Sequence, residues 1–128
     1  MRVLLCDPNH STKLALCGAL EMGGLAVISA TGVDEARFKI IMESPDFVLI
    51  DWLEFDIVHL DIKEFATQAK SMRPDTKFIF MSHKSVYTAV ATFEQMVTEY
   101  GADGYILKPF NVSHVLQMLK TWSPKLTN

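Results

Sequence analysis

The chain has 128 residues, of which 49% are hydrophobic, so it is long enough to bury the core of one domain. Its formal net charge is −3, which argues against the basic surface that nucleic-acid binding requires. No apolar run approaches the ~18–20 residues of a membrane-spanning helix, and the N-terminus reaches an acid at Asp7, too soon for a signal peptide.

We expect one domain over residues 1–122, followed by a short tail at 123–128. The two cysteines, Cys6 and Cys17, lie in apolar patterns, and we interpret them as reduced core residues. Reduced thiols are typical of cytoplasmic proteins, so we expect the chain to be cytoplasmic.

Five short apolar runs divide the chain, and each has the length of a β-strand. Continuous apolar runs, rich in β-branched or aromatic residues, are typical of strands that are covered on both faces of a parallel sheet. The runs are Val3–Cys6, Leu25–Ser29, Phe47–Ile50, Lys77–Met81 and Gly104–Leu107.

Between these runs, hydrophobic residues recur at the spacing of amphipathic helices, and Leu14 lies toward the edge of the first stripe. The five stripes are Leu16, Cys17 and Leu20; Ala36, Ile40 and Ile41; Ile62, Phe65, Ala66 and Ala69; Val86, Val90, Phe93, Val97 and Tyr100; and Val112, Val115, Leu116 and Leu119. Residues suited to begin or end these helices stand at their borders. They are Asn9 or Ser11, Pro45, Pro74, Gly101 and Asn111.

The strict alternation of strands and helices predicts an α/β fold with right-handed crossovers and a doubly wound parallel sheet. Five strands in a chain of this size fit the flavodoxin-like order 2-1-3-4-5, which is borrowed from known folds of this kind. We expect the first and last helices on one face of the sheet and the other three on the opposite face. In such folds, ligands bind beyond the carboxyl ends of the strands.

Four polar residues stand at that carboxyl edge. Asp7 follows the first predicted strand, Asp51 the third, Ser82 the fourth and Lys108 the fifth. Each alone is an ordinary residue at the end of a strand. Two acids, a hydroxyl and a lysine at one edge together form a candidate site.

The segments that carry these residues resemble the receiver domains of two-component response regulators. The resemblance covers nearly the whole chain, from Arg2 to about Trp122, and its most specific part is the run that ends in Lys108, Pro109 and Phe110. The segments are Val3–Asp7, Pro45–Asp51, Phe78–Ser82 and Gly101–Phe110.

The resemblance implies that Asp51 is a phosphoacceptor, to which a histidine kinase or phosphotransfer protein passes a phosphoryl group, giving an aspartyl phosphate. Lys108 would pair with the phosphoryl oxygens, and the Ser82 hydroxyl would donate a hydrogen bond to one of them. Tyr105 stands at the position of the family's switch aromatic. The chain would then be a phosphoprotein of a phosphorelay signal transduction system, and not an enzyme.

The resemblance also implies a Mg²⁺ site formed by Asp7, Asp51 and the backbone carbonyl of Leu53. Receiver domains usually have two consecutive acids after the first strand, whereas here Asp7 is followed by Pro8. Proline cannot supply a carboxylate, so we expect Mg²⁺ to bind weakly.

Two further segments depart from the family. The loop at 52–58 lacks the usual Met-Pro and Asp-Gly; its Glu54 or Asp56 either replaces the lost ligand or belongs to a solvated loop. The apolar residues of that loop either pack over the site or form a partner surface. The stretch 82–101 is longer than usual, and His83 replaces a small residue that would leave Asp51 more accessible. A degenerate receiver, acting as a phosphorylation-independent protein-interaction module, is therefore the alternative.

The family also implies partners besides the kinase. An output protein, or a second copy of the chain, would bind the face made by the fourth helix, the fifth strand and the last helix, with His114, Gln117 and Lys120 as candidate contacts. We expect no direct nucleic-acid binding and no membrane association.

Other classes fit less well. A haloacid-dehalogenase-like phosphatase needs an acid where Leu53 stands, and no Walker or dinucleotide-binding glycine motif is present. The segment Asp7–His10 is a poor phosphate loop for a flavin-binding protein. Ser82 and His83 are neighbours in a predicted strand and would point to opposite sides, and no nucleophile-elbow motif surrounds the serine. The histidines have no metal-ligand spacing.

Overall fold

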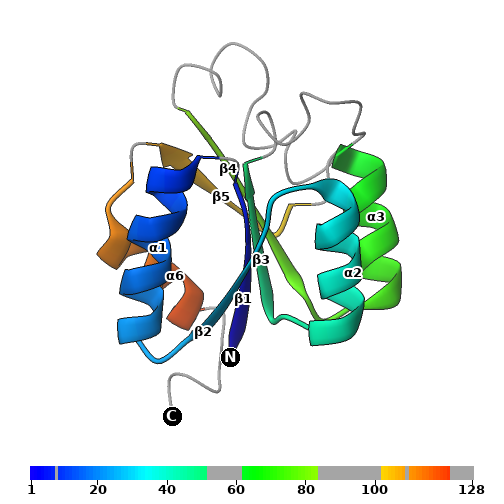
Figure 1. The fold of residues 1–128 in the computed structure, drawn as a ribbon, viewed down its shortest axis with the longest axis horizontal. Helices are drawn as coiled ribbons and strands as arrows, with labels where there is room; N and C mark the ends of the chain where they lie inside the picture. The colour runs from blue at the N-terminus through cyan, green and yellow to red at the C-terminus, as the bar shows by residue number, and fades with distance from the viewer. Residues whose placement is uncertain (8, 52–61, 84–101, 109, 122–128) are drawn as a thin grey trace.

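The computed structural model describes residues 1–7, 9–51, 62–83, 102–108 and 110–121 (Figure 1). The strands are β1 (Arg2–Cys6), β2 (Ala26–Ala30), β3 (Phe47–Asp51), β4 (Lys77–His83) and β5 (Gly104–Lys108). The helices are α1 (His10–Met22), α2 (Val33–Glu43), α3 (Ile62–Met72) and α6 (Val112–Thr121). None of the described helices is long and apolar enough to cross a membrane.

The five strands form one sheet in the order β2-β1-β3-β4-β5, and every neighbouring pair is parallel. This order confirms the prediction of a flavodoxin-like, doubly wound sheet. The register aligns Ile50 with Cys6 and Phe80, and it aligns Met81 with Asp51 and Ile106. The carboxyl ends of β1, β3 and β5 therefore lie at one edge of the sheet.

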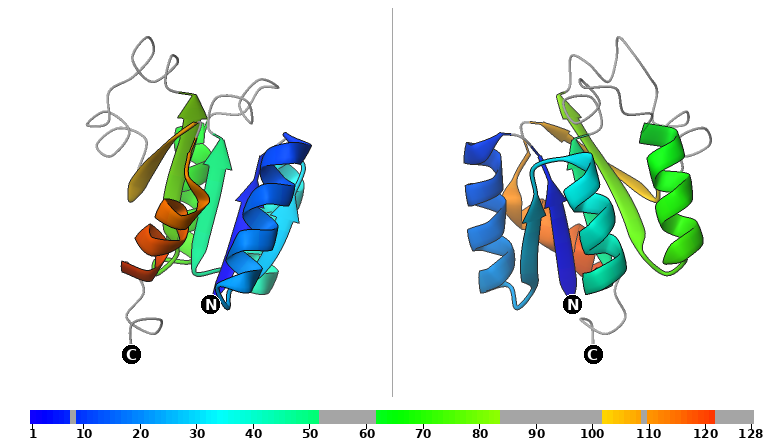
Figure 2. Two further views of the ribbon diagram at one scale, coloured as in Figure 1. Left: turned by 90° about the vertical axis from the view of Figure 1, so that its left-hand side faces the viewer. Right: turned by 45° about the vertical axis from the view of Figure 1, so that its right-hand side comes forward.

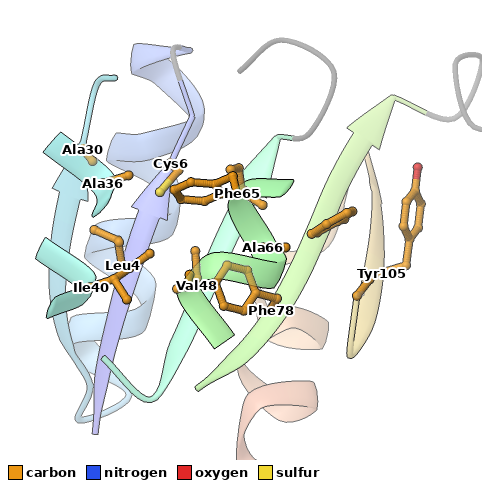
Figure 3. Close-up of a cluster of buried hydrophobic side chains, with 14 residues drawn as sticks. Leu4, Cys6, Ala30, Ala36, Ile40, Val48, Phe65, Ala66, Phe78 and Tyr105 are labelled. Atoms are coloured by element: carbon orange, nitrogen blue, oxygen red, sulfur yellow. The ribbon is translucent and has the colours of Figure 1, made fainter. Parts of the chain in front are cut away.

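Helices cover the sheet on both faces, with α1 and α6 on one side and α2 and α3 on the other (Figures 1 and 2). Each layer encloses its own buried cluster. The cluster under α2 and α3 includes Leu4, Ile40, Phe65 and Phe78 (Figure 3), and the one under α1 and α6 includes Leu20. The predicted faces are confirmed for these four helices, while the fourth predicted helix, in 84–101, lies outside the described residues.

The helix ends follow the predicted signals. Asn9 caps α1, because its Oδ1 accepts a hydrogen bond of 3.0 Å from the backbone N–H of Thr12. The Oδ1 of Asn111 accepts one of 2.9 Å from the backbone N–H of Ser113 at the start of α6. Ser44 follows α2 with a φ of 47°, a left-handed conformation that ends the helix just before Pro45.

One predicted core position is wrong. The sequence pattern places Ile41 in the buried stripe of α2, but its side chain is 41% exposed, whereas Ala36 and Ile40 are fully buried. Successive helical residues are rotated by about 100°, so a helix that directs Ile40 at the sheet turns Ile41 away from it. Cys6 is a free buried thiol as expected, and burial raises its pKa, while Cys17 is free and only half-buried.

Two leucines of α1 provide a matched test of this packing, since Leu20 is fully buried and Leu14 is 62% exposed. Leu20→Ala should lower the free energy of unfolding by about 2–5 kcal/mol, because it leaves a cavity between α1 and the sheet. Leu14→Ala should change it by less than about 0.5 kcal/mol. Urea denaturation followed by circular dichroism measures both, and equal losses would contradict the placement of α1.

Candidate functional site

Three of the four predicted site residues meet through one ion-pair cluster at the carboxyl edge of the sheet. The Nζ of Lys108 lies 2.6 Å from Oδ2 of Asp7 and 2.7 Å from Oδ2 of Asp51. Asp7 follows β1, Asp51 ends β3 and Lys108 ends β5, so the contact joins segments that are far apart in the sequence. A single ammonium group thus bridges two carboxylates.

The alternation of side chains along the strands explains why these residues meet. Leu49 and Ile106 belong to the cluster under α1 and α6, and Asp51 and Lys108 stand two residues further along the same strands. Side chains two residues apart in a strand share a face, so both polar groups point to the α1–α6 side. On this face, the side chains of β3 and β5 therefore change from apolar to polar at the carboxyl ends of the strands.

The cluster is almost entirely removed from solvent. Asp7 is 1% exposed and Asp51 is 3% exposed. The other oxygen of Asp7, Oδ1, accepts a hydrogen bond of 2.9 Å from the backbone N–H of Asn9. Buried carboxylates are stable only when they are paired and hydrogen-bonded, and these contacts meet that need.

The carboxylates also keep the lysine charged. Burial is the largest influence on Lys108 and by itself lowers its pKa, but the hydrogen bonds to Asp51 and then Asp7 raise it, and the net result is a raised pKa. The ammonium form is therefore held well above neutral pH. A fixed positive charge beside a carboxylate suits a site where negative charge accumulates.

The structure describes Ser82 and Tyr105 by their positions in the strands. Ser82 lies in β4, and its backbone is in register with Leu107, but its hydroxyl is not among the described atoms. Tyr105 pairs with Phe80 and is 8% exposed; Figure 3 draws it at the β5 side of the cluster under α2 and α3. The strand positions predicted for both residues agree with the structure, and their roles stay predictions.

The remaining site predictions fall outside the described residues. These are Pro8, the backbone carbonyl of Leu53, and the acids Glu54 and Asp56. Within the described ranges, no group of three or more His, Cys, Asp or Glu residues could hold a metal ion. The two carboxylates do offer hard oxygen ligands of the kind that Mg²⁺ prefers, and both already contact Lys108.

One contact of the site is not predicted from the sequence, namely the hydrogen bond that the backbone N–H of Asn9 donates to the Asp7 carboxylate. Asn9 is predicted only as the cap of α1, through its side chain. The signal lies in its position two residues after the acid, because an aspartate commonly accepts a hydrogen bond from the backbone two residues further on. Asn9 thus fixes the start of α1 and orients Asp7.

Comparisons with known proteins agree with the resemblance. No protein-family model matches the chain. A probable chemotaxis protein CheY of Rhizobium etli is 29% identical over 115 residues, which cover 88% of this chain and 84% of that protein. The phosphate regulon transcriptional regulatory protein PhoB of Pseudomonas aeruginosa is 25% identical over 120 residues, covering 92% of this chain but 49% of that protein.

Among solved structures, a CheY-like response regulator receiver domain protein of Methanospirillum hungatei has a TM-score of 0.77 and 27% sequence identity, and the match covers 98% of this chain and 93% of that one. The chain spans about half the length of most of the curated relatives that it matches. The matches therefore extend over nearly the whole of this chain, but over only a part of several of the relatives.

Lys108→Met tests the ion-pair cluster. Because the substitution leaves two buried carboxylates without their cation, the free energy of unfolding should fall by about 3–5 kcal/mol near neutral pH. The loss should be smaller at about pH 5, where a carboxylate without a cation can take up a proton. Urea denaturation at both pH values measures it, and Lys77→Met, at an exposed lysine of β4, is the control.

The native chain should respond to alkali as well. A raised pKa means that the stability contributed by charged Lys108 is complete below its ordinary value of 10.5 and is lost only as the pH rises through the raised value. Lys108→Met should remove that alkaline loss. A mutant with native stability near neutral pH would contradict the bridging role.

Proposed function

We propose that this chain, a receiver domain of the two-component response regulator type, accepts a phosphoryl group on Asp51 from a histidine kinase or phosphotransfer protein. The observation that supports the proposal is the Lys108 ammonium, which lies 2.7 Å from a buried Asp51 carboxylate at the carboxyl edge of the sheet. The sequence relatives and the solved neighbour support the same assignment.

The reaction is a transfer of one phosphoryl group between two side chains. A carboxylate oxygen of Asp51 attacks the phosphorus of a phosphohistidine, and the P–N bond breaks. The electron pair of that bond stays on the imidazole nitrogen, which takes up a proton, and Asp51 becomes an acyl phosphate. The ionised form of Asp51 is the nucleophile, and the Lys108 ammonium lies 2.7 Å from its carboxylate.

Lys108 has a second use after the attack. A transferring phosphoryl group carries negative charge on its oxygens, and fixed donors that face this charge lower the barrier. An ammonium held between Asp7 and Asp51 needs only a small displacement to reach oxygens bound to Asp51. The Ser82 hydroxyl is proposed as the second donor to these oxygens.

Mg²⁺ would be held by Asp7, Asp51 and the backbone carbonyl of Leu53, and when bound it supplies additional positive charge for the phosphoryl oxygens. Two carboxylates and one ammonium leave the described cluster with one net negative charge. With Pro8 in place of a second acid, we propose that the affinity of the site for Mg²⁺ is low.

The signal would pass from Asp51 on the central strand β3 to the edge strand β5. We propose that Ser82 moves toward the phosphoryl group and that Tyr105 fills the space it leaves, which makes the domain a two-state element. Leu107 and His114 line a cavity of about 350 Å³ between β5 and α6, next to Tyr105. This cavity supports the face with β5 and α6 as the place where an output protein or a second copy binds.

The phosphoacceptor is tested by intact mass after incubation with a small acyl phosphate and Mg²⁺. We expect slow addition of one phosphoryl group that hydroxylamine removes, as it does from acyl phosphates. Asp51→Asn should abolish the addition, and Asp75→Asn, at an exposed acid in the turn after α3, should leave it unchanged. No addition from the small donor or from a phosphohistidine protein would favour the degenerate alternative.

The weak metal site is tested by titrating Mg²⁺ while following the fluorescence of Trp52, which is adjacent to Asp51 in sequence. We expect little change up to millimolar Mg²⁺ in the natural sequence and a saturable change in Pro8→Asp, together with faster phosphorylation. Pro8→Asn, which restores a polar side chain without charge, is the control. Tight binding to the natural chain would show that Glu54 or Asp56 supplies the missing ligand.

A further inference from the structure

Helix α2 presents an apolar face to solvent. Phe38 is 62% exposed, Ile41 is 41% exposed and Met42 is 63% exposed. Residues three and four apart are neighbours on a helix surface, so these side chains form one continuous group, which we call the α2 apolar face. Single exposed hydrophobic residues are common on protein surfaces, whereas a contiguous group indicates an interaction site.

The contacts on either side of this face fix its orientation. Ala36 and Ile40 are fully buried against the sheet. On one flank of α2, the Arg37 guanidinium lies 5.8 Å from the centre of the Phe65 ring of α3. On the other flank, the Lys39 ammonium donates a hydrogen bond to the backbone carbonyl of Ser29 in β2. The α2 apolar face therefore points away from the sheet.

The charges beside this face are arranged asymmetrically along the helix. Asp34 and Glu35 lie in its first turn, and Lys39 follows one turn later, with its ammonium 2.9 Å from the Glu35 carboxylate. On the α3 side, the Arg73 guanidinium lies 2.6 Å from the carbonyl oxygen of Ile41, near the end of the helix. Acidic groups thus flank the beginning of the face, Lys39 flanks its middle and Arg73 its end, while Glu43, the last residue of the helix, is paired with Arg2.

We propose that the α2 apolar face binds a second copy of this chain, with α2 packed antiparallel against α2 of the partner subunit. A two-fold axis near Phe38 places each apolar face against the other, which buries all three side chains twice. It also brings residues before Phe38 opposite residues after it. Such a contact is isologous and self-complementary, as closed dimers require.

The charges select the antiparallel arrangement. With a rise of about 1.5 Å per residue, Glu35 lies roughly 4.5 Å before Phe38 and Lys39 about 1.5 Å after it along the helix axis. The dyad therefore brings Glu35 within about 3 Å, along the axis, of the level of the partner's Lys39. On the other flank, Asp34 comes opposite the end of the partner's helix, where the partner's Arg73 lies. Antiparallel helix dipoles also attract one another.

The contact is small. A helix of 11 residues is about 16 Å long, and interfaces below ~1,200 Å² are typical of weak, transient complexes. The dimer should therefore be weak and depend on concentration. It uses the face opposite to α6, and it does not rest on phosphorylation of Asp51, so either proposal can fail without the other.

Sedimentation velocity up to millimolar concentration tests the proposal on the full chain. We expect a monomer–dimer equilibrium in which Phe38→Glu weakens association by about tenfold or more. Leu14→Glu is the matched control, because Leu14 of α1 is exposed to the same 62%, and it should change association by less than about twofold. Asp51→Asn should associate like the natural chain.

A charge exchange tests the direction of the helices. Lys39→Glu alone should weaken the dimer, because it faces Glu35 of the partner subunit, and the double variant Glu35→Lys/Lys39→Glu should restore it. Circular dichroism checks that each variant is folded. A monomer at every concentration, a dimer that Phe38→Glu leaves unchanged, or a double variant that fails to recover would each overturn the proposal.

Discussion

The position of one ammonium group sets the charge balance at the carboxyl edge of this sheet. Two carboxylates buried side by side would repel each other and lose their hydration, and either effect alone costs several kcal/mol. The Nζ of Lys108 lies within 2.7 Å of both Asp7 and Asp51, and so offsets both costs at once. This arrangement is possible only because three parallel strands end at the same edge of the sheet.

The register of the sheet therefore decides whether the two buried acids meet a cation or an apolar side chain. A shift of one residue in β5 would turn Lys108 to the α2–α3 side and put an apolar residue beside two acids. The apolar runs of β1 and β3 resist such a shift because both of their faces are buried, and in β5 Tyr105 and Ile106 belong to the two opposite clusters. The core thus determines which side chain reaches the carboxylates.

Much of this arrangement is predictable from the sequence, and the exceptions have physical causes. The apolar runs predict the strands, because burial on both sides of a parallel sheet leaves a strong pattern. The helical spacing of apolar residues between these runs predicts α1, α2, α3 and α6. The order of the strands is borrowed from known folds of this kind. The pattern misplaces Ile41, because three apolar residues in a row do not reveal which of them faces the sheet. The 2.6 Å contact between Lys108 and Asp7 depends on side-chain geometry across three strands, which sequence spacing does not contain.

The missing acid at Pro8 bears on what would happen to Asp7 in the proposed transfer. Before transfer, the described contacts of Asp7 are the Lys108 ammonium and the backbone N–H of Asn9. A phosphoryl group on Asp51 adds negative charge that competes for the same ammonium. In the proposed transfer, Lys108 would turn toward the phosphoryl oxygens, and Asp7 would keep its backbone donor but lose its counter-ion in a site with almost no access to water. The cost of that loss would oppose the proposed phosphorylation, and a cation bound beside Asp7 would relieve it. The weak Mg²⁺ binding proposed on the basis of Pro8 would leave this cost in place, so the two proposals together lead to slow phosphorylation.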